Sequence, residues 1–170
     1  SETVRRIAYE LMSKEQAREF ENTMEMNLSH LDRSVGNFRV NIFRQRGTIS
    51  LVIRYVRSNV PPFDRLKLPS VLLDLVTAKR GLVLVAGATG SGKSTTLAAM
   101  IDHRNSTKPG HILTIEDPIE YLFEHKQSLV NQREIGVDTT TYANALQNAL
   151  REAPDLIMVG EVRDKETMQS

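Results

Sequence analysis

A glycine-rich segment in the middle of the chain has the residue types that bind phosphate. Gly87, Gly92, Lys93 and Ser94 satisfy the pattern G-x-x-x-x-G-K-[ST] without a gap. Glycines let successive backbone N–H groups turn inward around phosphate oxygens, where a Cβ atom would obstruct them. The lysine reaches the β- and γ-phosphates, and the serine hydroxyl ligates magnesium. The segment therefore predicts a nucleoside triphosphate site made of Gly87, Ala88, Thr89, Gly90, Ser91, Gly92, Lys93, Ser94 and Thr95.

The sequence on either side of this loop favours a functional match over an accidental one. With glycine at about 7% of positions, the pattern arises by accident in roughly one chain of this length in a hundred. The apolar run at residues 81–87 predicts a buried strand that leads into the loop, and a helix is expected from near Gly92. The N-terminus of that helix would add its partial positive charge to the phosphate site.

Acidic side chains follow two further apolar runs. Residues 112–115 predict a strand, and Glu116, Asp117 and Glu120 come just past its end. Pro118 cannot continue the strand, so these acids are expected in a loop. Glu161 ends a second such run, as in a Walker B segment. A lone acid would more simply be a solvated loop charge. Two acidic groups at the carboxyl ends of parallel strands instead predict groups that hold a metal ion and activate water.

Residues 1–58 have the pattern of a small α+β domain. Helical patterning comes first, and Ser13 with Gln16 has the spacing of a capping box within a helix predicted to run to residue 26. Residues 38–42 and 49–55 then alternate apolar and polar side chains on either side of a glycine turn. This alternation predicts two half-buried antiparallel strands.

The rest of the chain has the pattern of an α/β core. Three prolines predict a linker at residues 59–69. In residues 70–170, short apolar strands alternate with helices, which indicates a parallel sheet covered on both faces. One of these helices, within residues 139–150, is expected to be capped by Thr139 or Thr140.

The composition excludes several kinds of site. The chain has 170 residues, no cysteine and a net charge of +1, so disulfides, zinc ribbons and cysteine nucleophiles are excluded and no global field attracts nucleic acid. The longest apolar run is far shorter than the roughly 20 residues that a membrane span needs, and no signal peptide is recognisable. These features predict a soluble, cytoplasmic protein.

Four segments together resemble the secretion ATPases of type II secretion and type IV pili. They are residues 38–47, 81–100, 111–121 and 131–164. Within the family, these segments are similar to the PilT/PilU twitching-motility group. Residues 5–13 and 43–55 resemble PilU more than PilT. The resemblance implies a RecA-like P-loop ATPase core, mostly parallel sheet with flanking helices, preceded by a small α+β, PAS-like N-terminal domain. The family's His box and helical C-terminal region would follow Ser170, so the chain is expected to be a fragment.

The same resemblance implies roles for the acids and for the loop. Lys93 and Ser94 match the Walker A lysine and its magnesium-ligating neighbour. Glu120 matches the last glutamate of the family's Asp box, which acts as the general base on water, and Glu161 matches the Walker B glutamate. Glu120, Glu161 and Lys93 are thus the expected catalytic residues, and the expected magnesium ligands are Ser94, Glu116 and Glu161.

The resemblance also implies a role for arginines in a hexameric ring. By composition alone, the basic hairpin region that holds Arg33, Arg39, Arg44, Arg46, Arg54 and Arg57 would be a solvated sheet face. In the family, arginines of the N-terminal domain reach a neighbouring subunit's nucleotide, and Arg39 and Arg54 occupy the matching positions. Weaker candidates for the same interface are Arg133, Arg151 and Arg163.

The function expected from this resemblance is an ATP-hydrolysing motor subunit that powers type IV pilus retraction and twitching motility. Its cofactors would be ATP and Mg²⁺. Its partners would be identical subunits, or a PilT-type ATPase in the same ring, and the inner-membrane platform protein of the pilus, which would place it at the cytoplasmic face of that membrane.

Three alternatives stay open. One is a PilU-like accessory subunit that binds nucleotide and supports a PilT-type motor. A nucleic-acid translocase is disfavoured by the low net charge and by aromatics at only 5%, which leave little for base stacking. A small-molecule kinase would need a lid and an acceptor pocket, and the sequence identifies neither.

Overall fold

The computed structural model describes residues 1–32, 35–56, 59–162 and 167. The chain divides into two compact units, Ser1–Arg57 and Ser58–Ser170. Among the described residues, no helix is long and apolar enough to cross a membrane.

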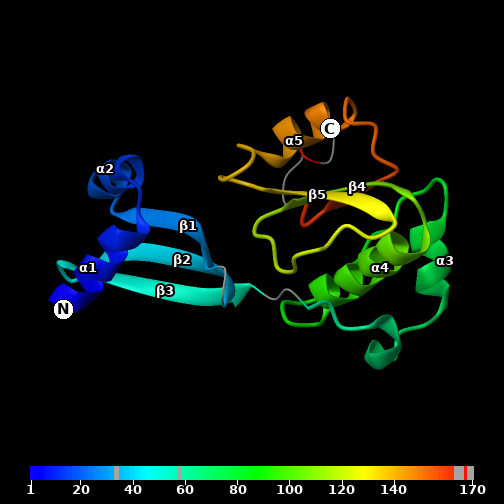
Figure 1. Ribbon diagram of the computed structural model, residues 1–170, viewed down its shortest axis with the longest axis horizontal. Coiled ribbons are helices and arrows are strands. Elements are labelled where there is room, and N and C mark those ends of the chain that lie inside the picture. The colour runs from blue at the N-terminus through cyan, green and yellow to red at the C-terminus, as the bar shows by residue number, and fades with distance from the viewer. Residues whose placement is uncertain (33–34, 57–58, 163–166, 168–170) are drawn as a thin grey trace. The chain divides into compact units, whose positions relative to one another are not determined.

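The first unit is a three-stranded antiparallel sheet with two helices on one face (Figure 1). Its elements are α1 (Glu2–Leu11), α2 (Lys14–Thr23), β1 (Glu25–Asp32), β2 (Gly36–Gln45) and β3 (Thr48–Val56), with the strands in the order β1-β2-β3. Phe20 of α2 and Val40 and Ile42 of β2 are part of one buried cluster between the helices and the sheet. The two predicted strands are confirmed, and β1 was not predicted.

The boundary between α2 and β1 differs from the prediction. The capping box is present, because the Ser13 side chain accepts from Gln16 N and the Gln16 side chain accepts from Ser13 N. The helix ends at Thr23, however, and Met24 adopts a left-handed conformation with φ of 64°. A residue in this conformation stops the helix and lets its N–H bond back to a helix carbonyl, here that of Phe20 at 2.8 Å. The chain is thereby free to start β1 at Glu25.

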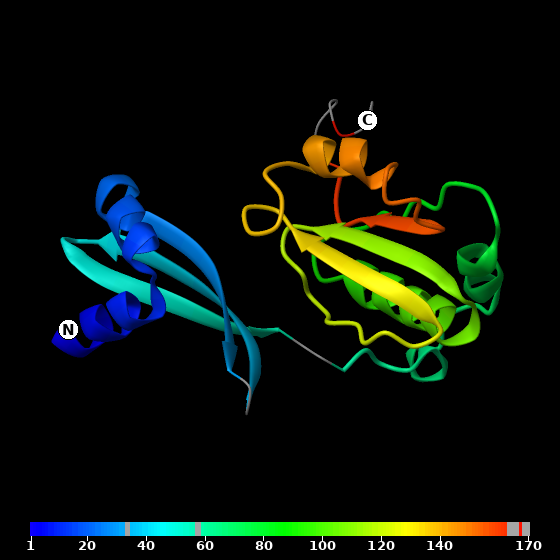
Figure 2. The same ribbon diagram turned by 45° about the horizontal axis from the view of Figure 1, so that its top comes forward.

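The second unit is a parallel sheet with helices on both faces (Figures 1 and 2). Its elements are η1 (Phe63–Leu66), α3 (Val71–Thr77), α4 (Lys93–Thr107), β4 (Gly110–Glu116), β5 (Ser128–Glu134), α5 (Tyr142–Ala149) and β6 (Leu156–Val159), with the strands in the order β5-β4-β6. Side chains of β4 alternate between the two faces: Leu113 and Ile115 pack with α5, whereas Ile112 packs with Ile101 of α4. The predicted parallel sheet is confirmed, with β5 as an unpredicted third strand.

Two local predictions about the second unit are wrong. Residues 81–87 do not form a strand, and Leu82 and Leu84 are 82% and 79% exposed. A strand is stabilised by backbone hydrogen bonds to a neighbouring strand, and the described ladders of this unit join only β4 with β5 and β6. The cap of α5 is Thr141 rather than Thr139 or Thr140, because the Thr141 side chain accepts from Asn144 N at 3.1 Å.

Candidate nucleotide and acid site

The phosphate loop, residues 87–92, has the backbone conformation that its glycines permit. Gly90 and Gly92 have φ angles of 79° and 94°, in the left-handed region that side chains with a Cβ disfavour. Gly92 is the N-cap residue of α4 and has no side chain with which to cap it. The first N–H groups of this 15-residue helix therefore remain available to an anion.

Lys93 lies over the phosphate loop. Its Nζ atom donates hydrogen bonds to the backbone carbonyls of Gly87 and Ala88, each at 2.9 Å. The ammonium charge is thus held beside the backbone that would surround a phosphate group. Carbonyl oxygens are neutral acceptors, so a phosphate oxygen would be a stronger partner for the same ammonium group.

The acidic loop, residues 117–123, meets the first turn of α4. The Ser94 hydroxyl donates to Glu120 Oε1 at 3.0 Å, and Thr95 Oγ1 lies 3.1 Å from the hydroxyl of Tyr121. Two segments that sequence analysis assigned separately to phosphate and to water activation are therefore in direct contact. The exposed Glu120 carboxylate lies beside the hydroxyl expected to bind magnesium.

Glu116 is placed differently from Glu120, because it is 7% exposed at the end of β4. Its Oε1 atom accepts from Thr114 Oγ1 at 2.6 Å and from Gln132 Nε2 at 3.2 Å. Burial raises the pKa of this carboxyl above its ordinary value, and these hydrogen bonds oppose the shift only in part. The negative charge of Glu120 adds to the increase in the pKa.

Glu161 lies at the same edge of the sheet. The parallel register pairs Ile115 with Val159, and Gly160 N donates to Ile115 O at 2.8 Å. A Cβ atom on Gly160 would lie 3.3 Å from the Cα atom of Glu116, so this glycine allows a close approach of the two strand ends. Among the described residues, no three His, Asp or Glu side chains form a cluster that could hold a metal ion.

Arg39 and Arg54 of the first unit lie on the sheet face that the helices do not cover. Arg39 and Arg54 are directly opposite each other in the register of β2 and β3, on the face away from the buried Val40 and Ile42. Of the other arginines, Arg44 pairs with Glu21, whereas Arg33, Arg57 and Arg163 lie outside the described residues.

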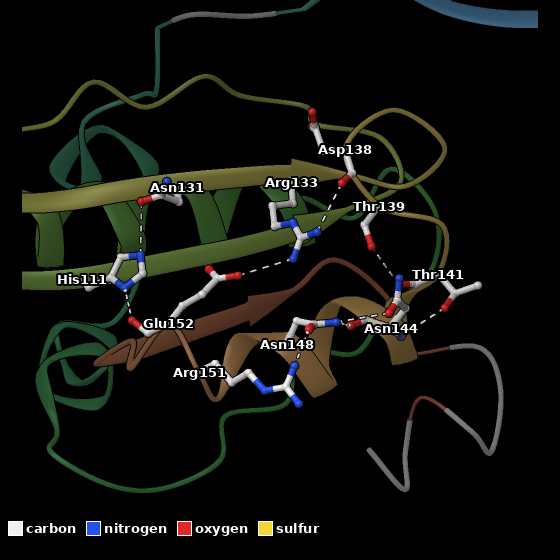
Figure 3. A network of polar contacts seen from close by, with 10 residues as sticks. All are labelled: His111, Asn131, Arg133, Asp138, Thr139, Thr141, Asn144, Asn148, Arg151 and Glu152. Carbon is white, nitrogen blue, oxygen red and sulfur yellow. Dashed lines mark hydrogen bonds and ion pairs between the residues drawn. The ribbon is translucent and has the colours of Figure 1, made fainter.

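The two weaker arginine candidates of the second unit are engaged by neighbours (Figure 3). Arg133 forms an ion pair with Glu152 at 3.5 Å and donates to the carbonyl of Asp138 at 3.2 Å. Arg151 donates to Asn148 Oδ1 at 3.2 Å. Either side chain would have to exchange these contacts before it could bind a neighbouring subunit.

Sequence reasoning missed the side chains of β5 that bind the backbone of the acidic loop. Gln132 and Glu134 of β5 contact this loop, and the Thr95–Tyr121 pair joins it to α4. The signal was present in β5, where Val130 is buried and the next two positions of the same face are polar. Polar residues at buried positions of a strand indicate specific hydrogen-bond partners.

Comparisons with known proteins identify the family. The model for type II/IV secretion system proteins matches residues 16–170. The type IV pilus ATPase PilU and the type IV pilus retraction ATPase PilT, both of Pseudomonas aeruginosa, are each 48% identical over 98% of this chain. The chain covers 44% and 48% of these two relatives, so it spans less than half of their length.

A solved structure agrees with the sequence comparisons. The crystal structure of the pilus retraction motor PilT with bound ADP is 51% identical and superimposes with a TM-score of 0.93, covering 97% of this chain and 48% of the PilT chain. This likeness confirms the predicted fold class, a parallel α/β core preceded by a smaller α+β unit. The chain belongs to the type II/IV secretion system protein family, among its PilT- and PilU-like members.

Proposed function

We propose that this chain is the nucleotide-hydrolysing part of a motor ATPase that powers type IV pilus retraction and twitching motility. The contact between Ser94 and Glu120 carries the proposal, because it brings a carboxylate into the first turn of the helix that follows the phosphate loop. The similarity to PilT, a retraction ATPase, supports retraction of the pilus rather than its assembly. On this reading residues 1–58 are a partial N-terminal domain, 59–69 a linker and 70–170 the ATPase core.

The residues present suit ATP with Mg²⁺. Loop N–H groups and Lys93 would hold the phosphates, and Ser94 with Glu161 would face the metal ion, directly or through water. Hard oxygen donors of this kind are those that Mg²⁺ prefers, and when bound the ion would neutralise charge on the phosphates. Glu116 is the weakest of the three expected ligands, because burial and two hydrogen bonds already occupy its carboxyl.

Hydrolysis would then use Glu120 as the general base. Its carboxylate accepts a proton from a water molecule as the water oxygen attacks the γ-phosphorus, and the bond to the ADP oxygen breaks to give ADP and phosphate. Arg39 and Arg54 of a neighbouring subunit would stabilise the charge that develops on the transferred group. Such a site is complete only in an assembly, for which a homo-hexamer or a mixed ring with a PilT-type ATPase is proposed, attached to the inner membrane through the pilus platform protein.

Mixing subunits of the full-length protein tests this proposal. Lys93→Gln impairs a subunit's own site but leaves its arginines intact, whereas Arg54→Ala does the reverse. Each variant alone should lose most ATP turnover, and a mixture should regain part of it, because some sites then combine an intact Lys93 with a neighbour's intact Arg54. A mixture of Lys93→Gln and Glu120→Gln is the matched control, since both lesions lie in the same subunit's site.

Recovery in the first mixture alone supports a shared site in a ring. Equal recovery in both mixtures, or in neither, contradicts it. A parent protein that hardly turns over ATP but stimulates a PilT-type ATPase would favour the accessory-subunit function, which the 48% identity to PilU also suggests.

A further inference from the structure

Strand β5 has three polar side chains on its inward face, buried at Ser128 and Glu134 and half-buried at Gln132. Ser128, Val130, Gln132 and Glu134 share one face of the strand, and Glu134 is only 5% exposed. Buried polar side chains lower stability unless they find hydrogen-bond partners. The last two positions of this face therefore need partners, and both find them in the acidic loop.

Gln132 binds that loop through both ends of its amide. Its Oε1 atom accepts from Phe123 N at 2.8 Å, and its Nε2 atom donates to the carbonyl of Tyr121 at 2.9 Å and to Glu116 Oε1 at 3.2 Å. A backbone N–H can only donate and a backbone carbonyl can only accept, so these two partners fix the orientation of the amide. Gln132 thus joins the end of β4 to the loop that follows it.

Glu134 binds the same loop on the other side of Glu120. Its Oε2 atom accepts from Ile119 N at 3.1 Å. The backbone is consequently tied to β5 at Ile119, just before Glu120, and at Tyr121, just after it. Because the loop lies outside the helices and strands of the unit, side-chain hydrogen bonds of this kind help to hold its backbone in place, together with the buried ring of Tyr121.

We propose that Gln132 and Glu134 are positioning residues, which hold the acidic loop so that the Glu120 carboxylate stays against Ser94. The proposal rests on the function given to Glu120 above. A general base works only within hydrogen-bond reach of the proton that it removes. Displacement of a reacting group by about 1 Å costs on the order of 100-fold in rate, so loss of these bonds should lower turnover without removing the nucleotide site.

Hydrogen exchange of the full-length protein tests whether the loop is held in this way. Gln132→Met keeps the length of the side chain and removes all three hydrogen bonds. Asn131→Met is the matched control, because Asn131 is the next residue of β5, points to the other face and contacts His111 Nε2 at 3.2 Å (Figure 3). Amides of residues 117–124 should exchange about tenfold faster or more in Gln132→Met, and no faster in Asn131→Met. Unchanged exchange in Gln132→Met would overturn the proposal.

Turnover tests whether holding the loop positions Glu120. In Gln132→Met, kcat should fall roughly 10- to 100-fold while nucleotide affinity changes less than about threefold. In a Glu120→Gln background the same substitution should cause no further fall, because it acts through Glu120. A further fall of equal size, or an unchanged kcat in the single variant, would overturn the positioning role. If Glu120→Gln alone leaves turnover unchanged, the function given to Glu120 fails, and the exchange rates still decide whether β5 holds the loop.

A second pair of variants keeps the test decisive if Gln132→Met does not fold. Glu134→Gln retains an oxygen that can accept from Ile119 N, whereas Glu134→Met removes the acceptor. The proposal expects near-parental kcat and exchange rates for the glutamine variant, and for the methionine variant a lower kcat and faster exchange of the amides of the acidic loop. Equal behaviour of the two variants would contradict it.

Discussion

The phosphate loop and the acidic loop lie on the same helix end but are held in different ways. In the phosphate loop, Gly90 and Gly92 supply left-handed backbone conformations. In the acidic loop, side chains from β5 bind the backbone, and Thr95 from the first turn of α4 contacts the hydroxyl of Tyr121. The backbone conformation of the phosphate loop therefore depends on two residues without a Cβ atom, whereas the acidic loop is held by hydrogen bonds of particular side chains from β5 and α4. Different substitutions should damage each.

The largest effect that separates the two loops is expected for Lys93→Gln. Loss of the ammonium removes the phosphate partner from the phosphate loop, so turnover should fall about 100-fold or more and nucleotide affinity should fall with it. Lys126→Gln is a suitable control, because Lys126 pairs with Asp102 at 2.6 Å and is given no role in the site. Titration with a fluorescent ADP analogue and phosphate-release assays check both. Similar losses in the two variants would contradict the role of Lys93.

A glycine substitution should weaken binding through the backbone alone. At Gly92 nothing lies within 4 Å of an added Cβ atom, so Gly92→Ala brings only the strain of the left-handed conformation, about 1–2 kcal/mol. Gly136→Ala is matched, with φ of 81° and the same free space, but it lies outside the phosphate loop. Both variants should melt at lower temperature, and only Gly92→Ala should lose nucleotide affinity, by roughly tenfold. Equal affinities would contradict a rigid phosphate loop.

A smaller effect is expected where the acidic loop meets α4. Tyr121→Phe and Thr95→Val each remove one partner of a 3.1 Å contact and leave the other hydroxyl without it, at a cost of about 1 kcal/mol. The double variant should be little less stable than either single variant, because the contact is lost only once. Chemical denaturation of all four proteins measures this coupling, and strictly additive losses would show that the contact does not stabilise the loop.

The smallest effect concerns pH and Glu116. A carboxyl whose pKa is higher in the folded chain holds its proton more tightly there, so the free energy of unfolding falls as pH rises above the ordinary pKa of 4.5. The side chain of the Glu116→Gln variant cannot ionise, so its free energy of unfolding does not fall with pH for this reason. Relative to the parent, the variant should therefore gain stability between about pH 4 and pH 7, in melts without nucleotide or magnesium. A constant difference in melting temperature would show that burial does not raise this pKa.

Local patterns were enough to single out much of the candidate site, because adjacent residues carry these patterns together; the roles of the residues stay a prediction. The spacing of Gly87 to Ser94 and the acids after β4 and β6 belong to this class, as does the capping box at Ser13. The failures depend on partners distant in sequence. Residues 81–87 are apolar enough for a strand, but pairing decides whether a strand forms.

The positions of Gln132 and Glu134 show the same limit. Alternation along β5 could have placed both on its buried face, but it could not show that residues 119–123 supply their partners. The cap of α5 was ambiguous for a simpler reason. Thr139, Thr140 and Thr141 are chemically equal candidates, and only the backbone conformation selects Thr141.

The most direct test of the central claim is phosphate release by the full-length parent and its Glu120→Gln variant at saturating ATP and magnesium, with nucleotide affinity measured alongside. Glutamine keeps an oxygen to accept the Ser94 hydroxyl but cannot take a proton from water. The account predicts that turnover falls about 100-fold or more while affinity changes less than about threefold. A variant that releases phosphate as fast as the parent would contradict the assignment of Glu120 as the base.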